Sequence, residues 1–233
     1  MACLRRRRCQ AWGKNVSETD SFIDEVTEEV RRDRLFRLLR RYGWIGIAAV
    51  LLIVGGAAWR EYSHAKERAA AEGLGDSILA AMETDDRGAR IDALEAIDPG
   101  APGGAALLGL LTAAEAATDE QTDKAEAALG QIARNGDIAQ IYRDIASFKL
   151  LLLQAETTDA AERRTGFEAL SRAGSPLRLL AEEQLALIEV ETGDRDAAVQ
   201  RFQAILEDSE VTAGLRQRVS QVIVALGGDL DAA

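Results

Sequence analysis

The sequence has few of the residues on which most active sites depend. Its 233 residues include two cysteines, Cys3 and Cys9, and a single histidine, His64. Both cysteines precede the long apolar segment described below, so residues 60–233 form no disulfide and must be held together by packing alone. Because His64 directly follows that segment, we expect no Ser-His-Asp triad, Cys-His pair or histidine-containing metal site in the rest of the chain.

The sequence also lacks the glycine-rich motifs that hold phosphate groups. Carboxylates are plentiful, and a site of two paired carboxylates stays open as an alternative, but they fall on polar helix faces, where solvation is their usual role. We therefore expect no enzyme, no catalytic residue and no cofactor or metal site. We expect His64 to be an exposed residue beside the long apolar segment, with a pH-sensing role as the alternative.

The longest stretch without charge is residues 42–59, YGWIGIAAVLLIVGGAAW. A helix of this length rises about 27 Å, enough to cross the hydrocarbon core of a bilayer. Aromatic residues stand near both ends, where indole and phenol rings favour the headgroup region. The segment therefore predicts a transmembrane helix, and a buried core helix is the alternative. The predicted interface anchors are Tyr42, Trp44, Trp59, Arg40, Arg41 and Arg60.

Positive charge gathers on the N-terminal side of this helix. Residues 1–41 carry 11 basic and 7 acidic side chains, a net of +4, whereas residues 60–233 carry 17 and 32, a net of −15. Close to the span, six arginines lie within residues 31–41, whereas only Arg60, Lys66 and Arg68 follow it closely. The positive-inside rule, which counts such flanking residues, predicts a cytoplasmic N-terminus and places residues 60–233 across the membrane, and the net charges agree. The acidic balance of the larger part argues against nucleic-acid binding.

A cleavable signal peptide is the alternative to a permanent anchor, because residues 56–58 are the small residues that a signal peptidase prefers. The charged segment before the span is long, however, and Trp59 suits a membrane interface better than a new N-terminus. We expect an uncleaved signal anchor. The small residues Gly46, Ala49, Gly55 and Gly56 would permit close contact with another helix in the membrane, although such residues are common in spans.

The segment before the span has two parts. Residues 1–16 lack periodicity and contain four consecutive arginines, so they suit a basic patch on the inner leaflet or a disordered tail. A further hypothesis is that translation begins at Val16, because a GTG codon can serve as a start. Residues 17–41 have the apolar spacing of an amphipathic helix, which either lies solvated on the leaflet or docks a cytosolic or membrane partner.

Residues 74–226 show no strand pattern and instead repeat themselves. Pairs of apolar residues three apart recur in short alanine-containing helices, each preceded by another apolar helix, and their first members are 35, 38 and 35 residues apart. Turn residues separate the units at 98–104, 135–137 and 174–176. The pairs are Leu94 with Ile97, Leu129 with Ile132, Phe167 with Leu170, and Phe202 with Ile205.

A helix–turn–helix unit of about 34 residues is the period of the tetratricopeptide repeat. The last unit fits that pattern best, with Gly193 in the turn, then Ala198 and Phe202. Glycine permits the tight turn, alanine lets the two helices approach, and the aromatic ring fills the gap between units. Arg90 and Arg163 replace the alanine in the first and third units.

The predicted architecture is therefore all-α: an amphipathic helix, one transmembrane helix and a degenerate tetratricopeptide-like α-solenoid. Residues 60–73 are expected to form a helical stalk and residues 74–226 the repeat domain, whose last helix caps the array and ends at Gly227. Residues 227–233 form a tail. A plain helical bundle is the alternative.

One stretch of the repeat domain stands out as a candidate partner groove. Residues 147–154 read SFKLLLLQ, with four consecutive leucines. They form either the most buried helix of the array or an apolar surface on which a partner docks. The candidate groove residues are Phe148, Leu150, Leu151, Leu152 and Leu153.

The anchor region and the array together resemble the YfgM-like proteins. The shared features are a basic segment ending in LLRRYGWI, one apolar span closing with GGAAWREY and a degenerate repeat array, covering residues 17–226. The resemblance implies an inner-membrane protein of a Gram-negative bacterium whose repeat domain lies in the periplasm. It also implies an ancillary role at the SecYEG translocon, beside a PpiD-like membrane-anchored isomerase-like chaperone, with contacts to exported polypeptides.

Two functional hypotheses follow. The first is this translocon-associated subunit with chaperone-like contacts. The second is a regulatory membrane anchor whose helix at residues 17–41 binds a cytosolic signalling protein.

The start-codon hypothesis predicts the N-terminal mass of the native protein. If translation begins at Val16, the first peptide starts with methionine at that position and residues 1–15 are missing. Mass spectrometry of the natively expressed protein measures this directly, and a peptide that contains Met1 contradicts it.

Overall fold

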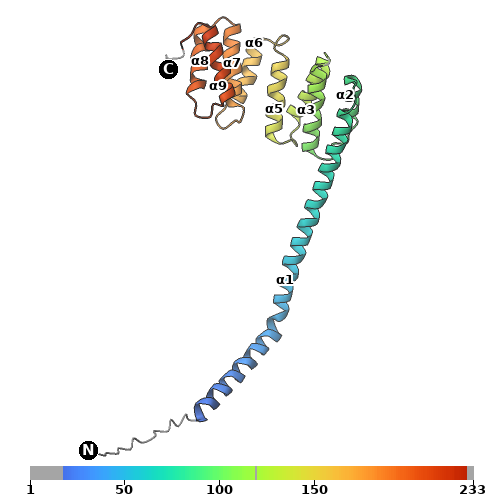
Figure 1. The fold of residues 1–233 in the computed structure, drawn as a ribbon, viewed down its shortest axis with the longest axis vertical. Coiled ribbons are helices and arrows are strands. Elements are labelled where there is room, and N and C mark those ends of the chain that lie inside the picture. Colours follow the sequence, from blue (N-terminus) through green and yellow to red (C-terminus); the bar gives the residue numbers. More distant parts are fainter. Residues whose placement is uncertain (1–17, 119, 230–233) are drawn as a thin grey trace, which may run out of the picture. The chain divides into compact units, whose positions relative to one another are not determined.

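The structure is a computed structural model that describes residues 18–118 and 120–229, with side chains described from residue 40 onward. Within these ranges the chain forms nine α-helices and no strand (Figure 1), which confirms the prediction of an all-α fold. The chain divides into two compact units between Glu67 and Arg68. Residues 1–16 lie outside the described residues.

The first helix, α1, runs from Glu18 to Met82 and passes through Gly73, where the stalk was expected to give way to the repeats. A glycine in a helix interior is less favourable than alanine by about 1 kcal/mol, which packing can offset. Here the last turns of α1 pack on the first unit of the repeat domain. The residues that make this contact on the α1 side are Leu74, Ile78, Ala81 and Met82.

The apolar part of α1 is exposed. By length and composition the helix can cross a membrane, and none of its apolar window is buried. Leu52 and Trp59 are among the exposed side chains. The alternative of a buried core helix therefore disagrees with the structure. The side chains of residues 17–39 lie outside the described set, so the amphipathic helix at 17–41 stays a prediction.

The repeat domain consists of helices that pack in chain order. Each helix from α2 to α8 contacts the next one, and α3 also contacts α5, as expected of an array in which units touch only their neighbours. The helices are α2 (Arg87–Glu95), α3 (Pro102–Thr118), α4 (Thr122–Arg134), α5 (Gln140–Leu153), α6 (Ala160–Leu170), α7 (Arg178–Glu191), α8 (Arg195–Glu207) and α9 (Ala213–Ala225).

Each unit pairs an A helix with a B helix. The A helices are the C-terminal end of α1 and the whole of α3, α5 and α7. The B helices are α2, α4, α6 and α8, and α9 follows the last unit. Aspartates cap the N-termini of three B helices; the Asp86 carboxylate, for example, accepts a hydrogen bond of 2.8 Å from the Ala89 amide. Gly193 turns the chain between α7 and α8 with a φ of 87°, a conformation that glycine adopts without strain.

The apolar pairs of the repeat lie in the core. Seven of their eight residues are buried, and Ile97 is partly buried against the first cluster. Ala125 and Ala198 are fully buried at the small position of the second and fourth units. Phe167 contacts Phe148 edge-on at 5.5 Å between ring centroids, which joins α6 to α5.

The arginines at the small position of the other two units join three parts of the chain. Arg163 is 5% exposed; its Nε donates to the Thr158 carbonyl in the turn before α6, and its Nη2 binds Glu191 at the end of α7. Arg90 repeats the arrangement with the Thr84 carbonyl and Glu115 of α3. The departure from alanine therefore replaces close packing with hydrogen bonds to the next unit.

Phe202 should be a large contributor to the stability of the last unit, because its ring is fully buried. Replacing it with alanine should lower the free energy of unfolding by about 3–5 kcal/mol. Urea denaturation of the full chain, followed by circular dichroism, measures the loss. Val224→Ala, on an exposed side chain, is the control, and an equal loss in both variants would contradict the assignment of Phe202 to the core.

Candidate interaction site

Apolar side chains are exposed on one class of helix. Within the described repeat domain, every large hydrophobic residue that is exposed lies on an A helix or on α9, and none lies on a B helix. These residues are Leu79, Leu107, Ile141, Tyr142, Leu152, Leu187 and Val224. The A helices therefore present an apolar surface that the packing of the array leaves uncovered.

Four of the exposed positions are equivalent in the repeat. Leu79, Ala114, Leu152 and Leu187 are separated by 35, 38 and 35 residues, the same spacing as the buried pairs. All four are exposed, the leucines at 65%, 41% and 39%. Because equivalent residues of stacked units project from the same face, these residues form what we call the apolar row.

Carboxylates gather where each A helix turns into its B helix. Four residues after each member of the apolar row stand Glu83, Thr118, Glu156 and Glu191, and further acids follow in every turn. Some of these acids are the N-caps described above, so part of the pattern stabilises the helices. We call the exposed carboxylates of the A–B turns the acidic edge: Glu83, Asp85, Asp86, Glu120, Glu156, Asp159, Glu162, Glu191, Asp194 and Asp196.

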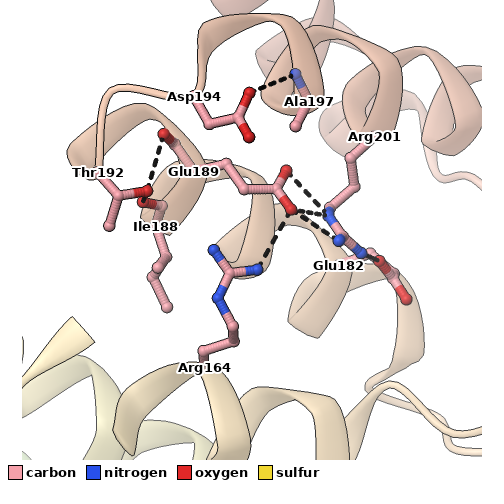
Figure 2. A network of polar contacts seen from close by, with 8 residues as sticks. All are labelled: Arg164, Glu182, Ile188, Glu189, Thr192, Asp194, Ala197 and Arg201. Carbon is pink, nitrogen blue, oxygen red and sulfur yellow. Dashed lines mark hydrogen bonds and ion pairs between the residues drawn. The ribbon is translucent and has the colours of Figure 1, made fainter. Parts of the chain in front are cut away.

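A polar network crosses the last two units at Glu189 of α7 (Figure 2). The Glu189 side chain is almost fully buried and accepts hydrogen bonds from Arg201 of α8, the shortest at 2.7 Å, and from Arg164 of α6 at 3.3 Å. Arg201 also binds Glu182 at 2.6 Å. The equivalent position is a buried alanine in the first two units, Ala81 and Ala116, so this glutamate occupies a core position.

The two arginines keep Glu189 charged. Burial is the largest single effect and raises its pKa, but the hydrogen bonds and charge of Arg201 and Arg164 together outweigh it and hold the pKa below the ordinary value of 4.5. Glu189 in turn raises the pKa of Arg201 further above its usual range. This carboxylate is therefore paired and structural, and it is not a free acid or base.

Other arginine–carboxylate pairs join the C-terminal helices. Arg218 of α9 binds Glu183 of α7 at 2.9 Å, and Arg178 at the start of α7 binds Asp208 and Glu210 in the loop before α9. A cavity of about 530 Å³ lies beside the Arg178 and Arg201 pairs, and its charged groups are already bound to one another. A second cavity, of about 320 Å³ between α2, α3 and α4, is lined by core residues of the first two units together with polar residues such as Glu95, Lys124 and Gln131.

The four-leucine stretch divides between two cores. Leu150 and Leu153 pack on the cluster of the first units, whereas Phe148 and Leu151 pack around Phe167 in the third and fourth. Only Leu152, in the apolar row, is exposed. The sole fully buried residue of α5 is Ala146, whereas α7 buries six, so α5 is not the most buried helix of the array.

The predicted interface anchors are exposed on α1. Tyr42, Trp44 and Trp59 all present more than half of their surface, and the Arg41 guanidinium lies 5.9 Å from the centre of the Tyr42 ring. Across the residues from 40 onward that the structure describes, no group of three histidine, cysteine, aspartate or glutamate side chains is placed to hold a metal ion.

The pairing of A and B helices and their neighbour-only packing agree with the comparison to protein families. Residues 40–172 match the tetratricopeptide repeat-like domain, more than half of the chain. The chain belongs to this tetratricopeptide repeat-like family. No curated protein and no solved structure matches it. The family match ends just after α6, so it covers the first three units, and the fourth unit and α9 continue the array beyond it.

Sequence reasoning missed two features of this tetratricopeptide repeat-like domain. The apolar row carries a signal in the sequence, since its members keep the repeat spacing, but exposure distinguishes it from the buried pairs and is known only from the fold. The buried Glu189 has no such signal, because its arginine partners come from two other helices.

Replacing Glu189 with glutamine should destabilise the domain, because Arg164 and Arg201 lose their shared carboxylate. We expect a loss of about 1–3 kcal/mol at pH 7 in the free energy of unfolding. Glu168→Gln, which changes an exposed acid on α6, is the control and should change little. Urea denaturation of the full chain measures both.

The same variant should show a defined pH dependence. Folding lowers the pKa of Glu189, so its contribution to stability is complete above a pH of about 4.5, the ordinary pKa of the group. The contribution is lost as the pH falls through the lower pKa of the folded state. The difference between wild type and Glu189→Gln should therefore shrink below pH 4.5. A difference that grows on acidification would contradict the assignment.

Proposed function

We propose that this tetratricopeptide repeat-like chain is a membrane-anchored scaffold that binds other proteins and catalyses no reaction. In this proposal α1 crosses the inner membrane with its N-terminus in the cytoplasm, and the repeat domain lies in the periplasm. There it acts as an ancillary subunit of the Sec translocon, beside a PpiD-like chaperone, and contacts exported polypeptides.

The anchor part of the proposal is supported by the charge and exposure of α1. Its apolar side chains are uncovered over the length that a bilayer requires, and arginines precede them while acidic residues predominate after them. A helix with that surface is costly to expose to water, and lipid is an environment that covers it. The same charge asymmetry supports the proposed orientation.

The apolar row is the observation that supports a binding function most directly. An uncovered leucine stands at the equivalent position of the first, third and fourth units, and apolar surface that gathers on one class of helix supports a contact with other proteins. The buried charges Arg163 and Glu189 are paired with Glu191 and Arg201, so they join helices and are not free titratable groups. Binding therefore accounts for these features better than an enzymatic reaction does.

The proposed mechanism uses the anchor to raise local concentration. A domain held within a few nanometres of a membrane complex meets its partners at an effective concentration of about millimolar for a short linker. Each contact through a single leucine can then be weak, and the partner protein still stays bound. The link to the Sec translocon rests on the resemblance of residues 17–226 to the YfgM-like proteins.

Purification at native abundance from mildly solubilised membranes tests the proposal, with mass spectrometry of the proteins that accompany the chain. We expect translocon subunits and a periplasmic isomerase-like chaperone. Recovery of cytosolic regulators alone would overturn the proposal and favour the regulatory anchor.

A truncation separates the two hypotheses within one chain. Deleting residues 1–34 removes most of the helix at 17–41 but keeps Arg37, Arg40 and Arg41 before the span. A translocon-associated scaffold should keep its partners after this deletion, whereas a regulatory anchor should lose them. Internal deletion of residues 74–226 is the matched control and should have the opposite effect.

A further inference from the structure

The apolar row and the acidic edge run in parallel. In the first, third and fourth units an exposed leucine near the end of the A helix is followed four residues later by an exposed glutamate. Glu191 is the last residue of α7, whereas Glu83 and Glu156 lie in the turns just beyond α1 and α5. The second unit keeps the register with the smaller Ala114 and the neutral Thr118. The two rows therefore repeat together once per unit.

Part of the charge beside the apolar row is uncompensated, although Asp86, Asp159 and Asp194 cap helices and the exposed Arg195 stands between Asp194 and Asp196. Glu83 and Glu156 have no cationic partner within the described part of the chain, whereas Glu191 binds Arg163 and still exposes half of its side chain. On the A helices, Lys149 is an exposed cation near the row, and Arg143 is turned toward the carbonyls of Gly136 and Ile138. A ligand on this face meets apolar contacts flanked by negative charge.

An α-helix is a ligand that can meet both rows at once. Residues seven apart on a helix lie on one stripe and recur about every 10.5 Å, so an amphipathic helix presents successive apolar side chains along one line and charged side chains along a neighbouring one. One stripe of such a helix would follow the apolar row, and a neighbouring stripe would follow the acidic edge.

We infer that the apolar row and the acidic edge together dock a cationic amphipathic helix of another polypeptide, with its apolar stripe on the row and its lysines or arginines toward the edge. This inference rests on the proposed scaffold function and names the chemistry of its partner. Charge complementarity decides the occupant, because an anionic lipid surface or a second copy of this domain would bring like charge to the edge.

Binding of designed helical peptides tests the inference. The full chain is placed in nanodiscs of phosphatidylcholine, and fluorescence anisotropy measures the binding of an 18-residue Leu/Lys amphipathic peptide. The matched probes are a Leu/Glu peptide of the same pattern and a Leu/Lys peptide with the leucine stripe scrambled. Protein-free nanodiscs supply the background. We expect the Leu/Lys amphipathic peptide to bind at least roughly tenfold more tightly than either matched probe.

Variants locate the binding. Glu83→Gln with Glu156→Gln should weaken the Leu/Lys peptide roughly fivefold at low salt and flatten the salt dependence, because two exposed charge pairs are lost. Glu168→Gln with Glu207→Gln removes the same charge from B helices and should leave binding unchanged. Leu79→Gln with Leu152→Gln should reduce binding further, and circular dichroism checks that each variant keeps its helix content.

Two results overturn the inference. If the Leu/Glu and Leu/Lys peptides bind equally, or if the two carboxylate pairs have the same effect, the acidic edge does not select the ligand. If no peptide binds, the row does not dock a helix. Neither result removes the proposed scaffold function, which fails only if the native protein is isolated without partners or with cytosolic regulators alone.

Discussion

The repeat domain depends on how closely each B helix approaches its A helix and the unit that follows. The approach is set at one position per unit, where Ala125 and Ala198 are fully buried, and an apolar pair four and seven residues later fills the space beside it. Since residues 60–233 contain no cysteine and no metal cluster was found in the described residues, the burial of these faces supplies most of the stabilisation. The stacking of the units and the exposure of one face of the A helices both follow from this contact between A and B helices.

The buried charged side chains in this packing are paired with side chains of other helices. Arg90 and Arg163 occupy the small position in alternate units, and each reaches a turn carbonyl and a carboxylate of the next unit. Glu189 does the reverse on α7, where a buried carboxylate is shared by two arginines. A buried charge is tolerated when it is paired and hydrogen-bonded, so these groups join neighbouring units and leave little free polar chemistry inside the domain.

The A and B helices also differ in the side chains that they expose. B helices expose polar and charged side chains, whereas A helices expose one apolar residue at the equivalent place of three units, with a glutamate four residues later at or just beyond the helix end. The fold therefore separates residues that hold units together from residues that are left available. The chain also carries, before its repeats, a helix long and apolar enough to cross a membrane, and under the proposed function the anchor would raise the local concentration at which the exposed residues meet a partner.

Much of this fold could be predicted from the sequence because period and burial coincide. The pairs from Leu94 to Ile205 keep the repeat spacing, and the match to the tetratricopeptide repeat-like family agrees with the predicted array. The end of α1 could not be predicted, since glycine propensity at Gly73 opposes the tertiary packing of Leu74 and Ile78, and packing wins. The partners of Glu189 could not be predicted either, because periodicity within one helix does not encode contacts among three.

The candidate site was located only in part. The four leucines at 150–153 draw attention by composition, yet three of them fill cores and one is exposed, because successive residues of a helix point about 100° apart. Leu79 and Leu187 lie in unremarkable sequence and become visible as a set once the units are aligned on the fold.

Site-specific photo-crosslinking in living cells tests the central claim most directly, which is that the A-helix face holds the partner. A photoreactive amino acid placed at Leu152 or Leu187 should form crosslinks to another protein, whereas the same amino acid at Glu168 or Gln200, exposed on B helices, should form none. Crosslinks from the B-helix positions alone would contradict this account and move the binding surface to the opposite helices.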